Sequence, residues 1–341
     1  MAASNHVARA ERAGNSGGVL NPAADSAVCP ACGDAGYRIL FRATDRLYQT
    51  TTREFRIVEC KGCRLLRLDP RPGVKELPDY YPRNYWFAPA EDAASRLEER
   101  WRRFALRDHV NFVERALRDS GERGLVLDVG CGGGLFLNLI RESTGLPVLG
   151  LDYSLDAARV AWSTNSVPAF CGTLCEVPLA EESCAAVTMF HILEHLHDPE
   201  PYVQCARRLL RPDGRLIVQV PNAGCWQFLL LGENWSGVDV PRHLVHFRQD
   251  DLVNLLEHCG FEMLRVKHFS LRDNPAGLAT SLAPSLDPMA RRVRQTPESP
   301  RMRMFRDLLY FALMCAVTPL TMLEAACRAG STIMVEARIR K

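Results

Sequence analysis

Three alternating glycines that follow an apolar run constrain the fold of this chain more than any other segment does. Residues 125–129 are apolar except for Asp128, and this composition predicts a buried strand. Gly130, Gly132 and Gly134 follow it, and a helix is expected to begin directly after them. Glycine adopts positive φ values without strain and lets a ligand lie against the backbone. The segment therefore predicts a nucleotide-binding turn behind the first strand of an α/β sheet.

Two acidic residues indicate which nucleotide this turn binds. The glycine spacing is G-x-G-x-G, whereas a dinucleotide fingerprint requires G-x-G-x-x-G. Asp128, at the end of the strand, would repel a pyrophosphate but attract a cation. Asp152 ends the next predicted strand about 20 residues later, where a carboxylate accepts hydrogen bonds from ribose hydroxyls. S-adenosylmethionine (SAM) carries an ammonium, a sulfonium and no phosphate, so the pattern favours SAM.

The sequence resembles the Rossmann-like methyltransferases that use SAM, from about residue 125 to 269 and again near 333–340. Besides the two acids and the glycine turn, residues 191–199 (HILEHLHDP) and 209–216 (LLRPDGRL) carry the resemblance. It implies an α/β fold in which a mostly parallel seven-stranded sheet has helices on both faces.

The same resemblance implies roles for individual residues. Asp128 would face the methionine end of SAM, Asp152 its ribose and Tyr153 its adenine. The other positions that the resemblance places at the cofactor are Gly130, Cys131, Gly132, Gly134, Phe190 and His191.

Two Cys-x-x-Cys pairs, Cys29 with Cys32 and Cys60 with Cys63, form a second motif. Each pair can fill two corners of a tetrahedron, and a spacer of about 27 residues suits a hairpin that joins them. Segment 26–72 resembles a zinc ribbon, and because four cysteines leave the metal no open position, its Zn²⁺ would be structural. The alternative is two redox-active pairs, which the lack of a βαβ pattern around them disfavours.

The charges of this ribbon leave its partner open. Arginines along 38–71 suit a nucleic-acid surface, but acidic residues alternate with them and aromatic residues are few. The net charge of the chain is +2, which neither supports nor excludes an anionic partner. A packing or substrate-presenting role is favoured over nucleic-acid binding, because similar ribbons precede the catalytic domain in several small-molecule methyltransferases.

The cysteines outside the two pairs bear on the compartment. Cys205, Cys259 and Cys315 lie in apolar segments and are expected to be buried thiols of a reducing compartment. The N-terminus carries no apolar signal segment. The sequence therefore predicts a cytoplasmic protein.

The domain organisation follows from these motifs. Four aromatic residues within 80–86 suggest either a lid over the cofactor or, as the favoured interpretation, packing between domains. The expected segments are a disordered N-terminus (1–25), the zinc ribbon (26–72), a linker with cover helices (73–120) and the methyltransferase domain (121–341).

A His-Glu-His cluster follows the predicted fourth strand. If a helical turn begins at His191, then His191, Glu194 and His195 share one face. Two imidazoles and a carboxylate could bind a divalent metal, as a similar cluster does in related quinone-pathway methyltransferases. The favoured alternative is that Glu194 and His195 shape the turn, and a third interpretation makes His195 a general base.

The region after the fifth strand is expected to form a wall of the acceptor pocket. Arg242 could pair with a carboxylate or phosphate of the acceptor, and His243 could deprotonate the attacking group. The favoured alternative for His243 is a structural hydrogen bond within its loop.

Segment 270–328 is an insertion between the last two strands, and it is too long for a plain loop. Residues 308–323 carry no charge and follow three arginines, although Pro319 is expected to interrupt a helix there. Segment 304–323 could lie on the inner membrane surface or cap a lipidic acceptor. An ordinary buried helix is slightly favoured.

Together these features predict a SAM-dependent methyltransferase with an N-terminal zinc ribbon. The expected acceptor is a small molecule, a sugar or a lipid-linked intermediate, methylated on oxygen or carbon. One alternative is a nucleic-acid-modifying methyltransferase that binds through the ribbon. Another is a non-catalytic scaffold with the methyltransferase fold.

Overall fold

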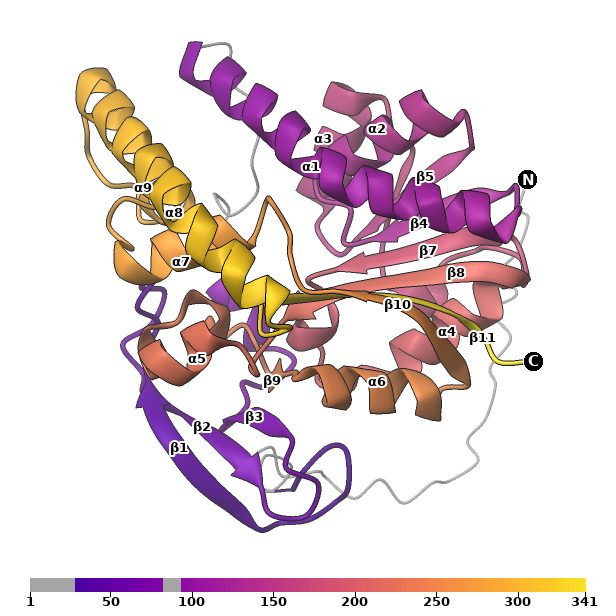
Figure 1. Ribbon diagram of the computed structural model, residues 1–341, viewed down its shortest axis with the longest axis horizontal. Helices are drawn as coiled ribbons and strands as arrows, with labels where there is room; N and C mark the ends of the chain where they lie inside the picture. Colours follow the sequence, from indigo (N-terminus) through magenta and orange to yellow (C-terminus); the bar gives the residue numbers. More distant parts are fainter. Residues whose placement is uncertain (1–27, 82–92) are drawn as a thin grey trace, which may run out of the picture.

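The computed structural model describes residues 28–81 and 93–341, and of residues 93–98 it describes the backbone alone. The predicted disordered N-terminus and most of the aromatic segment 80–86 therefore lie outside the described residues. The chain forms a seven-stranded sheet and a four-stranded sheet (Figure 1). In the larger sheet the order is β10-β11-β8-β7-β4-β5-β6.

Five parallel strands make up the half of the large sheet that carries the glycine turn. Alternate residues of its central strand enter two different cores, since Val126 packs on one face and Leu127 on the other. These strands are β4 (Leu125–Val129), β5 (Val148–Asp152), β6 (Ala169–Cys171), β7 (Cys184–Phe190) and β8 (Leu210–Pro221).

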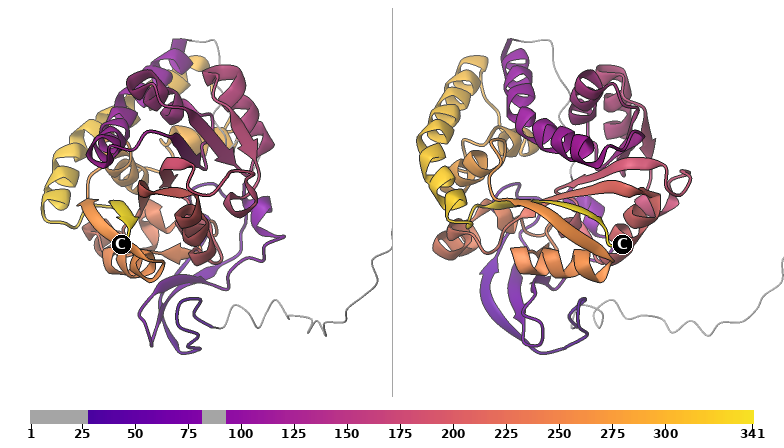
Figure 2. Two further views of the ribbon diagram at one scale, coloured as in Figure 1. Left: turned by 90° about the vertical axis from the view of Figure 1, so that its right-hand side faces the viewer. Right: turned by 45° about the vertical axis from the view of Figure 1, so that its right-hand side comes forward.

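Helices cover both faces of this sheet, as predicted (Figures 1 and 2). On one face, Leu106, Val110, Val113 and Leu117 recur at helical spacing in α1 and pack on the sheet together with α2 and α3. On the other face lie α4 and α6. The bounds are α1 (Ala93–Ser120), α2 (Leu135–Thr144), α3 (Leu155–Asn165), α4 (Glu200–Leu209) and α6 (Gln249–His258).

The antiparallel end of the sheet closes the fold. β11 (Thr332–Ile339) inserts between β8 and β10 (Phe261–Lys267), and it runs antiparallel to both. The insertion between β10 and β11 folds into three helices, which lie together at one end of the molecule (Figure 1). They are α7 (Asn274–Leu282), α8 (Pro288–Val293) and α9 (Pro300–Ala326).

Two expectations about α9 are wrong. The helix continues through Pro319 instead of being interrupted there. A proline in a helix interior costs about 3 kcal/mol, which tertiary contacts elsewhere along a 27-residue helix can offset. The favoured buried helix is also not observed, because only 22% of the most apolar 18-residue window of α9 is buried.

The small sheet joins the cysteine module to the methyltransferase domain. β1 (Tyr37–Ala43), β2 (Phe55–Cys60) and β3 (Leu66–Asp69) form an antiparallel meander, and β9 (Val245–His246) adds a fourth strand beside β3. The apolar side chains of this sheet share a core with the segment that follows β8 and includes α5 (Trp226–Leu231). The module is therefore a continuous part of the wall that carries His243.

Candidate functional site

The turn between β4 and α2 has the geometry that its glycines predict. Gly130, Gly132 and Gly134 have φ values of +76°, +51° and +75°. A Cβ at Gly130 would lie 2.1 Å from Ile192 Cδ1, and one at Gly134 would lie 3.0 Å from Ala161 Cβ. A Cβ at Gly132 would meet no atom of the described residues within 4 Å. The turn is thus packed at both ends and open at Gly132, where a ligand can reach the backbone.

Asp152 lies directly beside this open position. Its Oδ2 accepts a hydrogen bond from the Gly132 N–H (2.9 Å), and its Oδ1 accepts one from the Ser154 N–H (2.8 Å). The side chain is buried, and burial raises the pKa of the carboxyl despite these two hydrogen bonds. Each carboxylate oxygen has a second lone pair. Asp152 can therefore accept hydrogen bonds from a ligand without leaving the turn.

Asp128 is buried at the end of β4. Its Oδ1 accepts a hydrogen bond from the Thr188 hydroxyl at 2.6 Å. Burial, with a smaller contribution from the charge of Asp152, raises the pKa of Asp128 to about 7. A carboxyl in this state ionises more readily once a cation approaches.

The other predicted cofactor residues occupy different environments. Cys131 is buried against Gly150, because a Cβ at Gly150 would lie 2.5 Å from the Cys131 sulfur. Cys131 therefore packs between the turn and β5. Tyr153 is 77% exposed and free to cover a planar ligand. The Phe190 ring meets the rings of His109 and Phe136 edge-on, each at 5.0 Å.

His191 belongs to a series of polar side-chain contacts that the sequence did not predict. Its Nδ1 lies 3.1 Å from Glu194 Oε1, and its Nε2 lies 2.8 Å from Gln219 Nε2, which donates to Asp273 Oδ2 at 2.7 Å. Buried His109 lies 3.6 Å from the same Asp273 oxygen. Burial alone would lower the pKa of His191, but Asp273 and Glu194 raise it to about 9. Gln219, Asp273 and His109 come from β8, the insertion and α1, so no local motif identifies them.

The predicted metal-binding set is only partly assembled. A single 3₁₀ turn begins at Leu193, and His191 precedes it with φ of +58°, so His191 does not share a face with His195. Instead Glu194, His195 and His243 have donor atoms within 4.8 Å of one another. Glu194 Oε2 is buried without a hydrogen-bond partner among the described residues. One carboxylate oxygen and two imidazoles are donors that a divalent metal accepts.

The two predicted catalytic histidines lie side by side but differ in exposure. Their ring centroids are 4.6 Å apart. His243 is buried, its Nδ1 donates to the Gly237 carbonyl at 2.9 Å, and burial lowers its pKa well below the ordinary value. His195 is partly exposed, and its Nδ1 lies 2.8 Å from the Tyr81 hydroxyl and 3.1 Å from the Arg242 carbonyl. His195 is thus the more accessible base, and His243 supports it.

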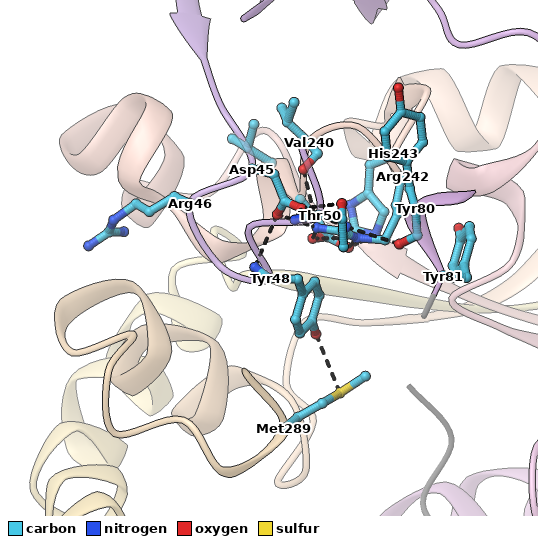
Figure 3. A network of polar contacts seen from close by, with 12 residues as sticks. Asp45, Arg46, Tyr48, Thr50, Tyr80, Tyr81, Val240, Arg242, His243 and Met289 are labelled. Carbon is cyan, nitrogen blue, oxygen red and sulfur yellow. Dashed lines mark hydrogen bonds and ion pairs between the residues drawn. The ribbon is translucent and has the colours of Figure 1, made fainter. Parts of the chain in front are cut away.

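Arg242 does not serve as an acceptor ligand, contrary to the prediction. It is fully buried, and its Nη2 donates to Asp45 Oδ1 at 2.8 Å and to Asp239 Oδ1 at 2.7 Å (Figure 3). Its guanidinium lies 4.4 Å from the Tyr48 ring centroid. Burial would raise the pKa of Asp45, but Arg242 outweighs this and holds it below the ordinary value. The arginine therefore anchors the cysteine module to the loop that carries His243.

We expect Arg242→Met to destabilise the protein by about 3–5 kcal/mol, because the change leaves the buried carboxylate of Asp45 and the partly buried one of Asp239 without their cation. The free energy of unfolding in urea measures the effect. The matched control is Arg42→Met, which removes an exposed arginine that pairs with Glu54 at 2.7 Å. We expect a cost below about 1 kcal/mol there. Equal costs for the two variants would contradict the anchoring role.

The four cysteines of the two pairs converge at the end of the small sheet. Their sulfurs all lie within 4.8 Å of one another, with Cys29 3.5 Å from Cys63 and Cys32 3.5 Å from Cys60. Four sulfurs at about 2.3 Å from one tetrahedral zinc would be spaced similarly. The donor set therefore fits a structural Zn²⁺.

The other cysteines only partly follow the prediction. Cys259 is buried and unpaired, as expected. Cys315 is exposed on α9, and Cys205 forms a disulfide with Cys175, so neither is a buried thiol. The two partners are 30 residues apart and come from the 3₁₀ turn Leu174–Glu176 and from α4, so their contact depends on the tertiary fold.

Comparison with known proteins finds a family match that includes the glycine turn. The model of the methyltransferase domain family matches residues 95–266. A "Probable S-adenosylmethionine-dependent methyltransferase" of Mycolicibacterium smegmatis is 32% identical over 57% of this chain and 66% of its own length. A ubiquinone biosynthesis O-methyltransferase of Cupriavidus pinatubonensis is 28% identical over 48% of this chain and 69% of its own.

A solved structure of a SAM-dependent methyltransferase from Archaeoglobus fulgidus aligns with 72% of this chain and all of its own, with a TM-score of 0.45 and 18% identity. The chain spans just under two thirds of the mycobacterial relative and 60% of a related protein from Mycobacterium tuberculosis. The family match covers half of the sequence, so this chain belongs to the methyltransferase domain family.

Proposed function

We propose that this protein transfers a methyl group from SAM to a hydroxyl or carbon of a small-molecule, sugar or lipid-linked acceptor. The observation that carries the proposal is the contact of Asp152 with the open Gly132. A carboxylate with further lone pairs, beside an accessible backbone turn at the carboxyl ends of parallel strands, suits an adenosine ligand. Asp128 adds a buried acid that suits a cation.

Each part of the site has a role in this proposal. SAM supplies the activated methyl group. The glycine turn and Asp152 hold the nucleoside, and Asp128 neutralises the amino acid end. His195 accepts the proton of the attacking hydroxyl, because it is the accessible imidazole of the pair, while His243 and the Arg242 carbonyl fix its orientation. Positioned proton acceptors contribute about 10²–10⁴-fold to such reactions.

The acceptor class is inferred from a relative and from the paired charges of the ribbon. One relative is named a ubiquinone biosynthesis O-methyltransferase, which favours a hydroxylated small molecule. The arginines of the ribbon support nucleic-acid binding poorly, since Arg38, Arg42 and Arg56 pair with Glu59, Glu54 and Asp69. Neutralised arginines offer little charge to a phosphate backbone.

A methyl-transfer assay with radiolabelled SAM tests the proposal. We offer the protein a prenylated catechol, a hexose and a short structured RNA, and measure the label in each product. We expect label in the catechol or the hexose. Label only in the RNA would establish the nucleic-acid alternative, and SAM binding without any transfer would support the scaffold.

The raised pKa of Asp128 leads to a pH-dependent prediction. The carboxyl is protonated in the folded chain up to about pH 7 but ionised in the unfolded chain above about pH 4. The folded state therefore binds the extra proton, and its stability falls as the pH rises through this window. Asp128→Asn removes this penalty. Relative to wild type, we expect the variant to gain about 2–3 kcal/mol between pH 5 and pH 8.

Urea unfolding of both proteins at the two pH values measures this gain. The same variant should bind S-adenosylhomocysteine about tenfold more weakly at pH 8, because an amide offers the ligand ammonium no charge. A stability difference that stays constant with pH would contradict a raised pKa. Unchanged affinity would remove Asp128 from the cofactor site.

We also propose that the four-cysteine site binds one structural Zn²⁺. The support is the clustering of the four sulfurs and the backbone turns that present them. The Gly33 N–H donates to the Cys29 carbonyl at 2.9 Å, and the Arg64 N–H donates to the Cys60 carbonyl at 3.1 Å. The cytoplasmic location stays a prediction. The Cys175–Cys205 disulfide weakens the argument that the cysteines outside the two pairs are thiols of a reducing compartment.

A further inference from the structure

The helix α9 turns several polar side chains inward, beside the buried Met314, and most of its large apolar side chains outward. On the buried side, the Tyr310 hydroxyl lies 2.8 Å from the Thr280 hydroxyl, and Glu324 Oε2 accepts from Gln227 Nε2 at 2.7 Å. On the opposite side, Phe305 is 62% exposed and Leu308 is 55% exposed. Further large apolar side chains exposed on α9 are Met302, Leu309, Phe311, Leu320, Met322 and Leu323. This polarity is the reverse of that of a helix on a water-soluble surface.

Cationic residues flank the outward apolar surface. Arg301, Arg303 and Arg306 precede residues 308–323, which carry no charge, and Arg328 follows α9. Part of this charge is paired within the fold, because Arg306 pairs with Glu298 at 3.1 Å and Arg303 lies 3.9 Å from Asp307, which also pairs with Arg291. Arg291, Arg301, Arg303 and Arg306 still outnumber Glu298 and Asp307 by two, and Glu324 is buried. The outward surface is therefore apolar in the middle and carries a net positive charge at the ends. Apolar side chains bordered by arginines suit the interface of an anionic bilayer.

The neighbouring helix α1 extends this surface. The Trp101 ring meets the Phe311 ring edge-on at 5.3 Å, and Phe104 is 48% exposed next to it. Figure 1 shows the two helices at the same end of the molecule, away from the small sheet. Tryptophan side chains such as that of Trp101 favour the headgroup region of a membrane.

We propose that α9 docks lengthwise on a bilayer that contains anionic phospholipid. By length and composition α9 is sufficient to cross a membrane. In this fold it cannot do so, because its buried side packs on α7 and β11 begins a short loop later inside the central sheet. A helix held along its length presents its outer side in the plane of the membrane, with Phe305 and Leu308 among the acyl chains.

The insertion that would dock also borders the candidate site. The insertion that forms α7, α8 and α9 starts beside Asp273, which is linked to His191 through Gln219. A lipid-linked acceptor could then enter from the bilayer. This last step rests on the proposed methyl transfer, whereas the docking itself does not.

Vesicle flotation tests the docking. The full-length protein is mixed with vesicles of phosphatidylcholine alone or with about one third phosphatidylglycerol. We expect strong binding to the anionic vesicles, several-fold weaker binding in 0.5 M NaCl, and at least tenfold weaker binding for the double variant Phe305→Glu/Leu308→Glu. The control is Trp162→Glu, which places one glutamate charge at a 64% exposed apolar residue of α3. It should bind like wild type.

Two further measurements separate the outcomes. Titration with S-adenosylhomocysteine shows whether the double variant is folded at the cofactor site, independently of any acceptor. Light scattering gives the oligomeric state of wild type and variant. Vesicle binding by a folded double variant would overturn the proposal. A wild-type dimer that ignores vesicles and dissociates in the variant would overturn it in favour of a second copy of this chain.

Discussion

Cys60→Ser is expected to abolish stoichiometric zinc and to lower the melting temperature by at least about 5 °C. Zinc binding by four cysteines contributes roughly 10 kcal/mol to the folding of small modules, and three cysteines retain little of it. The effect should spread beyond the module, because β3 pairs with β9 and Asp45 binds Arg242 across the same boundary. We therefore also expect weaker ordering of the loop that carries His243.

Metal analysis of the purified protein and thermal unfolding with and without a chelator measure this result. The control is Cys327→Ser, which removes an exposed, unpaired thiol far from the four sulfurs in sequence. It should keep one equivalent of zinc and the wild-type melting temperature. A wild-type protein that contains no zinc and is insensitive to the chelator would refute the structural metal and leave the redox alternative.

Asp152→Ala is expected to weaken S-adenosylhomocysteine binding by at least about 100-fold. Two hydrogen bonds from ribose hydroxyls to a carboxylate are worth about 3 kcal/mol together, and the variant also releases the Gly132 N–H. Asp152→Asn keeps one oxygen and should show a smaller loss. Calorimetric titration gives both dissociation constants.

A matched control separates this effect from a change in surface charge. Asp156→Ala removes an exposed acid four residues further on, where it pairs with Arg159 at 3.4 Å. Its affinity should stay within about twofold of wild type, since exposed pairs contribute little. Affinity for Asp152→Ala within threefold of wild type would remove Asp152 from the site. No binding by a folded wild type would contradict the proposed cofactor and favour the scaffold.

Local motifs predicted the parts of the site that lie close together in the sequence. The strand, the glycine turn and the helix that follows form one continuous segment, so φ requirements and apolar alternation specify them. The position of Asp152 follows from the next parallel strand, because neighbouring strand ends meet at one edge. The cysteine spacing likewise predicted that four sulfurs would meet.

The partners of buried charges could not be predicted in the same way. Arg242 sits in a loop beside two histidines, and its charge pointed to an acceptor. Its partner Asp45 lies 197 residues away in the sequence. The pairing of β3 with β9 and the core that the small sheet shares with this loop bring the two together, and burial then makes their ion pair obligatory. The metal-binding alternative changed for the same reason, since His243 reaches Glu194 from a distant loop.

By itself, the sequence determined the glycine turn with its flanking parallel strands and the cysteine cluster, because each depends on backbone preferences and spacing over a few tens of residues. The seven-stranded sheet as a whole was expected from the family resemblance. The tertiary structure decided which histidine is accessible, which acids are neutralised and which side of α9 faces outward. These properties depend on what a side chain is packed against, and elements far apart in the chain supply those neighbours.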